Sequence, residues 1–201
     1  MNFWDRLQQE RNLITDMLLR EHEIRYFADH LTEHPRDRTP FSIESIARDT
    51  ACCFTGHRPE KLKRAYEECL KRLCSAIMDA YDCGYRIFIS GMARGVDLWA
   101  AHIILVLRSL HPEIRLVAAI PFDGFIRKWC QEEQQIYQVI LNQVDAFCIV
   151  TTVRAARSFQ LRNVWMVDHS SRLIACWDGE PGGTANTIQY AKRRNTTIIL
   201  I

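Results

Sequence analysis

Three glycine-containing turns carry residue types that can bind phosphate. In chain order they are Thr55-Gly56-His57-Arg58-Pro59, Ser90-Gly91-Met92-Ala93-Arg94-Gly95-Val96-Asp97 and Asp178-Gly179-Glu180-Pro181-Gly182-Gly183-Thr184. Glycine lets the backbone approach a ligand closely and adopt positive φ angles. The amide groups at the start of a following helix point outward and carry partial positive charge. Together the three turns predict an anion-binding crevice.

Hydroxyl and guanidinium side chains in the same turns strengthen this prediction. Thr55, Ser90 and Thr184 can donate hydrogen bonds to phosphate oxygens, and Arg58 and Arg94 can form charge-assisted bonds. None of the turns matches G-x-G-x-x-G or G-x-x-x-x-G-K-[ST]. The sequence therefore disfavours a standard dinucleotide-dependent enzyme and a Walker-type NTPase.

A helical segment further along the chain offers a second group of polar and aromatic side chains. Arg162, Trp165 and Asp168 recur at helical spacing, with Asn163 beside them. We expect Trp165 to stack on a base or ribose and Asp168 to accept hydrogen bonds from ribose hydroxyls. The alternatives are that Trp165 packs in the core and that Asp168 is a solvated or capping residue.

Acid–base chemistry in the crevice has three candidates, Asp97, His57 and Asp168. Among the histidines His57 is favoured, because it lies inside a glycine turn. Trp129 and Tyr137 are interpreted as core residues. No Gly-x-Ser-x-Gly elbow occurs. Whether the protein is an enzyme stays open at this stage.

The turns are positioned by an alternation of short apolar runs and longer helical patterns that begins near residue 50. The runs predict six strands, at residues 51–55, 86–90, 115–120, 146–151, 172–177 and 196–201. Because each run is apolar almost throughout, we expect helices on both faces of a mainly parallel sheet, an α/β doubly wound fold. All three turns follow strands, so they share the carboxyl edge where such sheets bind ligands.

The segment before residue 50 is interpreted as an N-terminal helical extension, residues 1–49, ahead of a single domain at residues 50–201. Apolar residues recur at helical spacing through residues 1–33, and the prolines at 35 and 40 interrupt the pattern. The helix packs on the domain or binds a partner. A homodimer is compatible with this arrangement.

Composition restricts the partners. The 201 residues carry 26 Lys and Arg against 24 Asp and Glu, a net charge of +2. This balance does not favour nucleic acid as the partner. The eight cysteines form no C-x-x-C pair, and no metal site or cofactor is expected.

The N-terminus lacks the apolar core of a signal peptide, and no apolar run is long enough to span a membrane. We therefore expect a cytoplasmic protein.

The three turns, with Arg-Asn-Val-Trp-Met-Val-Asp at 162–168 and Trp-Asp-Gly-Glu-Pro-Gly-Gly-Thr-Ala-Asn-Thr at 177–187, resemble the YpsA-like branch of the SLOG superfamily. This superfamily joins the DNA-processing protein A group and the Lonely Guy phosphoribohydrolases. The resemblance covers residues 50–201 and implies a Rossmann-like fold with a site for nucleotides or nucleotide-derived ligands. The positions that it implies as ligand-lining are Gly56, Arg58, Ser90, Gly91, Gly95, Asp97, Gly182, Gly183 and Thr184.

Two departures from these relatives bear on function. Lonely Guy enzymes carry a catalytic Glu shortly after their Gly-Gly and Gly-Thr pairs, and here residues 184–190 contain no Glu. Arg162 matches their helix arginine, but without the acid the sequence argues against N-glycosidic hydrolysis. The loop at residues 90–97 looks like that of the DNA-processing group, whose other parts are absent.

Three functions are compatible with these observations. The favoured one is binding or sensing of a small phosphate-bearing, nucleotide-like ligand. The first alternative is a hydrolase acting on an N-glycosidic or phosphate bond of a nucleotide. The second is a single-stranded DNA-binding module, which predicts a basic groove and a steep dependence of affinity on salt.

Overall fold

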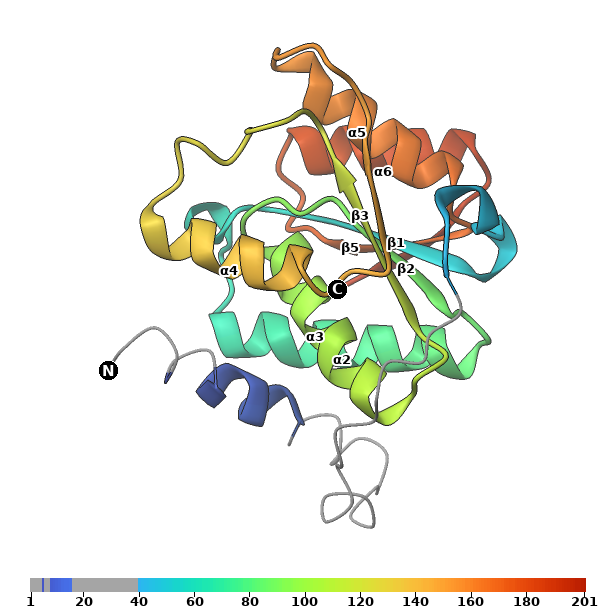
Figure 1. The fold of residues 1–201 in the computed structure, drawn as a ribbon. Helices are drawn as coiled ribbons and strands as arrows, with labels where there is room; N and C mark the ends of the chain where they lie inside the picture. The colour runs from blue at the N-terminus through green and yellow to red at the C-terminus, as the bar shows by residue number, and fades with distance from the viewer. Residues whose placement is uncertain (1–4, 6–7, 16–39) are drawn as a thin grey trace.

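The computed structural model describes residues 5, 8–15 and 40–201 (Figure 1). Six strands form one parallel sheet: β1 (Ala51–Gly56), β2 (Ile87–Ser90), β3 (Arg115–Ile120), β4 (Ala146–Ile149), β5 (Arg172–Cys176) and β6 (Thr197–Leu200). Their spatial order is β4-β3-β2-β1-β5-β6, with every neighbouring pair parallel. The predicted α/β fold with a six-stranded sheet is confirmed.

Five helices connect the strands: α2 (Tyr66–Asp82), α3 (Val96–Leu110), α4 (Gln131–Leu141), α5 (Arg157–Asp168) and α6 (Gly183–Arg193). In Figure 1, α2, α3 and α4 lie below the sheet, and α5 and α6 lie above it. The chain builds outward from β1 to β4, then returns through α5 to place β5 on the other side of β1. The strand order therefore reverses between β1 and β5, the kind of switch point where doubly wound folds bind ligands.

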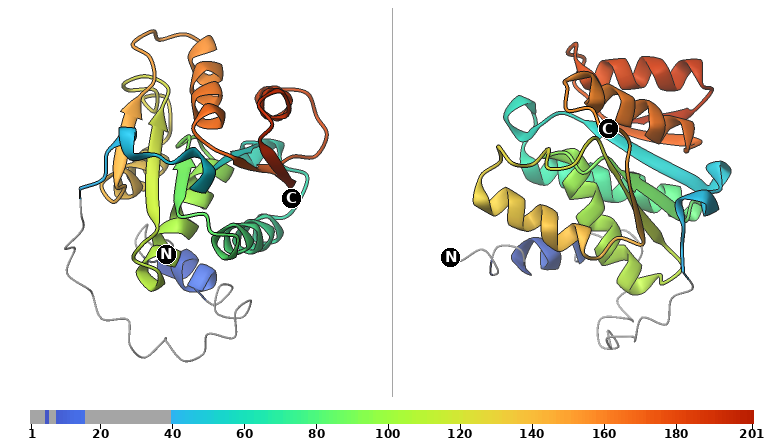
Figure 2. Two further views of the ribbon diagram at one scale, coloured as in Figure 1. Left: turned by 90° about the vertical axis from the view of Figure 1, so that its right-hand side faces the viewer. Right: turned by 45° about the horizontal axis from the view of Figure 1, so that its top comes forward.

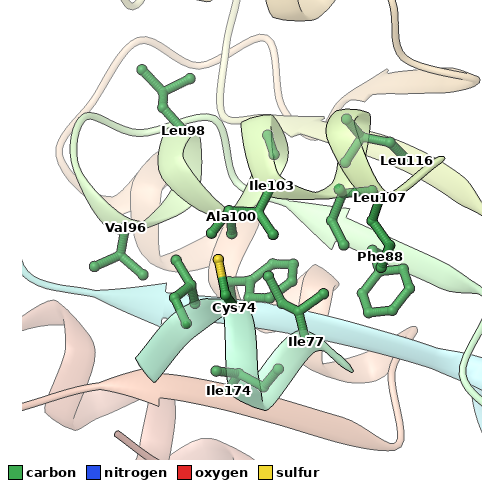
Figure 3. Packing of buried hydrophobic residues seen from close by; sticks show 14 of the residues in the cluster. Cys74, Ile77, Phe88, Val96, Leu98, Ala100, Ile103, Leu107, Leu116 and Ile174 are labelled. Atoms are coloured by element: carbon green, nitrogen blue, oxygen red, sulfur yellow. The ribbon is translucent and has the colours of Figure 1, made fainter. Parts of the chain in front are cut away.

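Two apolar layers hold the helices on the sheet. The larger contains alternate residues of the strands, including Phe54, Phe88 and Ile174, with the inner faces of α2, α3 and α4. Figure 3 shows part of this packing. The smaller contains the other strand faces, including Ile89 and Leu173, with residues of α5 and α6. Burial on both faces explains why the central strands are apolar throughout.

The two edge strands depart from that expectation. Phe147 and Ile149 on β4, and Leu200 on β6, are exposed. Each of these edge strands has a neighbouring strand on one side only, so less of its surface is covered. Apolar side chains remain at these positions although the sheet does not bury them.

The N-terminal residues that the structure describes are helical over 8–15 and pack beside α3 (Figure 2). Ile14 is fully buried in the larger core, and His102 Nδ1 lies 3.2 Å from Glu10 Oε1. The remainder of the predicted helix at residues 1–33 lies outside the described residues. Two short 3-10 helices, η2 (Ile43–Ser45) and η3 (Arg48–Thr50), lead into β1. Within the described ranges, no helix has the length and apolarity needed to cross a membrane.

Candidate functional site

A crevice of about 600 Å³ opens at the carboxyl edge of the sheet, across the β1/β5 switch point. Its volume is within the range of small-molecule sites, about 300–1,000 Å³. Eleven of the residues singled out from the sequence line it: Thr55, Gly56, His57, Arg58, Arg94, Asp97, Arg162, Asn163, Gly182, Gly183 and Thr184. Parallel strands bring these distant segments together because all their carboxyl ends lie at one edge.

The first turn is tightly packed against the start of α3. A Cβ atom at Gly56 would lie 2.6 Å from Val96 Cβ, so only glycine lets α3 approach β1 this closely. After Arg58 the chain forms the 3-10 helix η4 (Pro59–Lys61), with Pro59 at its first position, where a missing N–H costs little. The α-helix that follows this turn starts only at Tyr66. The turn therefore presents His57 and Arg58 from a loop and not from an α-helix N-terminus.

The second turn is held by its own hydrogen bonds. Ser90 Oγ donates to the carbonyl oxygen of Asp97 at 2.8 Å and accepts the N–H of Met92 at 3.1 Å. Ser90 is fully buried and does not line the crevice. Gly95 has φ +84°, and a Cβ there would lie 2.9 Å from His57 O. The first two turns thus pack on each other through Gly95, which itself lies outside the crevice lining.

A buried ion pair joins the second turn to α5. Arg162 Nη1 donates to Gly91 O and lies 3.3 Å from Asp97 Oδ2, which also accepts the N–H of Ala93 at 3.3 Å. Arg162 is 4% exposed and Asp97 7% exposed. Burial raises the pKa of Asp97 against the opposing effect of Arg162, and burial lowers the pKa of Arg162. A side chain at Gly91 would collide with this pair.

The third turn is open. Gly182, with φ +150°, precedes the first residue of α6, and no side chain caps this helix. A Cβ atom at either Gly182 or Gly183 would meet no atom within 4 Å. Asn163 Nδ2 donates to Thr187 Oγ1 at 2.8 Å, and Thr187 Oγ1 donates to Gly183 O at 2.7 Å. These bonds orient the start of α6, where Gly183 and Thr184 line the crevice.

Trp165 and Asp168 lie elsewhere. Trp165 packs against the smaller core, and its ring stacks on His169 at 4.0 Å between centroids. Asp168 accepts a hydrogen bond from Tyr190 Oη at 2.9 Å, and its Oδ1 lies 2.8 Å from Arg194 Nε. Neither side chain lines the crevice. Residues spaced by three drift about 60° around a helix of 3.6 residues per turn, so residue 168 lies about 120° around α5 from residue 162.

Three aromatic side chains that the sequence did not single out as ligand-binding also line the crevice. They are Phe125 and Trp129, from the segment between β3 and α4, and Phe159 of α5. Phe125 lies 5.4 Å from Trp129 and 6.3 Å from Phe159 between ring centroids, in edge-to-face geometry. Tyr137 is buried behind them, as its core assignment predicts. The sequence feature that could have identified Phe125 and Trp129 as crevice residues is their position soon after the third predicted strand.

The crevice has an excess of positive charge. Arg94 lies 3.0 Å from Oε1 of both Glu60 and Glu133, so its charge is balanced. Lys61, Lys128 and Arg58 also line the crevice. Within the part of the chain that the structure describes, no ion pair holds any of these three cations.

A histidine–carboxylate contact joins the first and third turns. His57 Nε2 lies 2.9 Å from Asp178 Oδ1, and both side chains are largely buried. The contact is close but does not have the geometry of a hydrogen bond. Asp178 lay in the third predicted turn but was not singled out there. Among the described residues, no group of three or more potential metal ligands occurs.

The fold and the crevice define a Rossmann-like α/β protein with a candidate ligand site at its topological switch point. The family model YpsA, described as the YspA SLOG family, matches residues 52–200. The chain therefore belongs to the YpsA family of the SLOG superfamily, as the resemblance predicted.

Two relatives from Bacillus species show the level of sequence similarity. The chain is 30% identical over 118 residues to the uncharacterized SPbeta prophage-derived protein YoqJ of Bacillus subtilis, covering 53% of this chain and 69% of YoqJ. It is 28% identical over 150 residues to a UPF0398 protein of Bacillus thuringiensis, covering 70% and 81%.

Among solved structures, the fold is similar to DNA processing protein A from Helicobacter pylori, a structure concerned with that protein's single-stranded DNA binding mode. The TM-score is 0.55 at 15% identity, covering 85% of this chain and 74% of that one. DNA processing protein A from Streptococcus pneumoniae gives a TM-score of 0.53 at 14% identity, covering 76% and 50%. At this level of identity the likeness concerns the fold.

Proposed function

We propose that this protein binds a phosphate-bearing nucleotide or nucleotide-derived ligand in the crevice and acts as a binding or sensing domain. The observation that carries the proposal is the composition of the crevice lining, which combines glycines and cations with three aromatic rings. A nucleotide offers its phosphate to the first kind of group and its base to the second.

The phosphate end is formed by the start of α6 and the first turn. The free amides at a helix N-terminus favour an anion, and the open space over Gly182 and Gly183 lets a phosphate reach them. The hydroxyl of Thr184 and the guanidinium of Arg58 line the same crevice and add donors. Arg58 has no ion-pair partner among the described residues, so no protein carboxylate competes with a ligand for it.

The base end is formed by Phe125, Trp129 and Phe159. Half-buried rings that are held in place by edge-to-face contacts offer surfaces on which a base can stack. Stacking of a base on an aromatic side chain contributes about 1–3 kcal/mol. These rings take the role that the sequence interpretation gave to Trp165.

Binding without turnover is favoured by the state of the candidate acids. The carboxylate of Asp97 holds Arg162 and the Ala93 N–H, and that of Asp168 holds Tyr190 and Arg194. A role in proton transfer would disturb contacts that hold the loop at 90–97 and the packing of α5 on α6. We therefore expect Asp97 to stabilise the site and not to catalyse a reaction.

Single-stranded DNA is the second candidate ligand. The likeness to DNA processing protein A and the exposed cations Lys61 and Lys128 in the crevice lining support it. It predicts that affinity increases with oligonucleotide length and falls steeply with salt. A mononucleotide-sized ligand predicts neither a length dependence nor a steep salt slope.

The test is a thermal-shift screen of the full chain against nucleotides, cyclic and linear dinucleotides, ADP-ribose, NAD, nucleotide sugars and thymidine oligonucleotides of increasing length. A ligand that binds only the folded state raises the melting temperature. The strongest compound is then titrated by calorimetry into the wild type, Arg58→Ala and Lys71→Ala. Both variants remove one exposed positive charge, but Lys71 lies on α2 away from the crevice.

We expect Arg58→Ala to weaken binding about tenfold, the value of one charge-assisted contact, and Lys71→Ala to leave the affinity unchanged. Equal affinities for all three proteins would contradict the phosphate assignment. Stabilisation by long oligonucleotides alone would replace the nucleotide by DNA as the ligand.

A further inference from the structure

The contact between His57 and Asp178 lies at the switch point of the sheet, beside the proposed phosphate end. His57 follows β1 and Asp178 follows β5, two neighbouring strands whose last residues pair as Gly56 with Cys176. His57 is 7% exposed and lines the crevice together with Gly182 and Gly183. His57 therefore lines the ligand space, and its Nε2 lies beside a carboxylate.

The carboxylate is held in its charged form. Burial acts to raise the pKa of Asp178, but the Glu180 N–H, His57 and Lys63 together lower it below its usual value. Glu180 N–H lies 3.4 Å from Asp178 Oδ1, and Lys63 Nζ lies 2.7 Å from Glu180 Oε1. The second oxygen, Asp178 Oδ2, is buried without a hydrogen-bond partner in the described part of the chain. His57 is the side chain that the structure places in direct contact with this carboxylate.

Other charged groups of the crevice surround His57 from each element packed there. Arg58 lies in the first turn, and Lys61 and Lys63 follow it; Asp178 and Glu180 lie in the third turn. The second turn and α5 contribute Arg94, Asp97 and Arg162, and the segment before α4 contributes Lys128. Arg94 is balanced by two glutamates, and Arg162 by Asp97. Asp178, in contrast, forms no ion pair with an Arg or Lys among the described residues. A bound anionic ligand would be a second negative charge close to His57.

We propose that His57 contacts the bound anion as an imidazolium and that Asp178 is the positioning residue which holds it there, so that ligand binding takes up a proton. This inference rests on the proposed function and extends it to regulation by pH. The reason is electrostatic, because an imidazolium between two anions is stabilised by both. Histidine is the side chain whose ordinary titration range lies close to neutral pH.

The sign of the effect follows from linkage. If the bound state favours protonated His57 more than the free state does, binding is accompanied by proton uptake. Affinity is then highest below the titration range of His57 and decreases as pH rises through it. A nucleoside monophosphate titrates in the same range, since its second pKa is about 6. Sulfate is the cleaner probe, because its charge does not change over the titration range of histidine.

The experiment follows the histidine ring signals of the full chain by NMR during a pH titration, in sodium sulfate and in sodium chloride of equal ionic strength. Backbone amide signals of Gly182 and Gly183 report whether sulfate occupies the phosphate end. His169, which stacks on Trp165 outside the crevice, is an internal control in the same sample. Asp178→Asn is the matched variant, because it removes the charge and preserves the shape of the side chain.

We expect sulfate to raise the titration midpoint of His57 by about half a pH unit while that of His169 stays unchanged. In Asp178→Asn the midpoint of His57 should fall in both salts. Shifts of the Gly182 and Gly183 amides with no change in the His57 midpoint would overturn the coupling but leave the phosphate site intact. Sulfate that shifts neither glycine would contradict the anion site itself, and the inference with it. An unchanged midpoint in Asp178→Asn would remove Asp178 as the positioning residue.

Discussion

The glycine turns that follow β1 and β2 differ from the turn that follows β5 in what surrounds them. A side chain at Gly56 would collide with Val96, and one at Gly95 would collide with the backbone of His57. By contrast, a Cβ at Gly182 or Gly183 would enter open space within the crevice lining. The first two turns need glycine for the packing of the protein on itself, and no such packing explains Gly183.

The difference separates two causes that look identical in a sequence. Glycine permits close approach, whether the approaching group belongs to the protein or to a ligand. In the first two turns the approaching groups are α3 and the neighbouring turn. In the third turn the space is empty of protein atoms and adjoins the start of α6. The glycines of the first two turns therefore serve folding, whereas the open space at Gly183 is what the proposed approach of a ligand requires.

The largest effect is expected at the ion pair below the second turn. Replacing Arg162 with methionine leaves the buried carboxylate of Asp97 without its cation, which should reduce the free energy of unfolding by about 3–5 kcal/mol. Urea unfolding followed by circular dichroism measures this loss. Asp97→Asn in the same chain should recover part of it, since the two residues interact. A loss below about 1 kcal/mol would show that the pair does not support the turn.

Gly95→Ala should have the next largest effect. Its positive φ and its contact with His57 O both exclude a side chain, so we expect a loss of about 2–3 kcal/mol in unfolding free energy. The matched control is Gly84→Ala, which has φ +93° but no atom within 4 Å of the added Cβ. The same urea experiment separates strain from collision, because only Gly95→Ala has both. Equal losses in the two variants would argue that packing of the turns contributes nothing.

Trp129→Leu probes the aromatic end and should change binding more than folding. We expect the variant to weaken binding of a nucleotide by about 1–2 kcal/mol and to leave binding of ribose 5-phosphate unchanged, because the sugar phosphate has no base to stack. Trp165→Leu is the control, since Trp165 lies outside the crevice. Calorimetric titration of both compounds into both variants gives the comparison. An equal loss of affinity for the nucleotide and for ribose 5-phosphate would show that the base does not stack on Trp129.

The strands could be predicted because burial determines their composition. Each observed strand agrees with its apolar run to within about two residues at either end. The spatial order of the strands could not be predicted, because the pattern of apolar residues does not indicate which strands pair with each other. The exposure of Phe147 and Leu200 follows from their position on edge strands, so it could not be predicted either.

Site residues that adjoin strand ends could be predicted from the sequence. Site residues on helices could be predicted only in part, because the rotation of the helix about its axis determines which side chains reach the crevice. His57, Arg58 and Gly183 line the crevice because parallel strands deliver their carboxyl ends to one edge. Trp165 shares a helix with Arg162 but packs in the core, and its spacing in the sequence did not reveal this. Phe159 joins Phe125 across 34 positions of sequence, a contact that only the tertiary structure defines.

The most direct test of the account is the affinity of Gly183→Ala for the ligand identified in the screen, measured by calorimetry beside the wild type. Because the added methyl group meets no protein atom, the melting temperature should change by no more than about 2 °C. Because the same methyl group occupies the space proposed for the phosphate, affinity should fall about tenfold or more. A variant that is as stable as the wild type and binds as tightly would contradict the assignment of the third turn to the ligand.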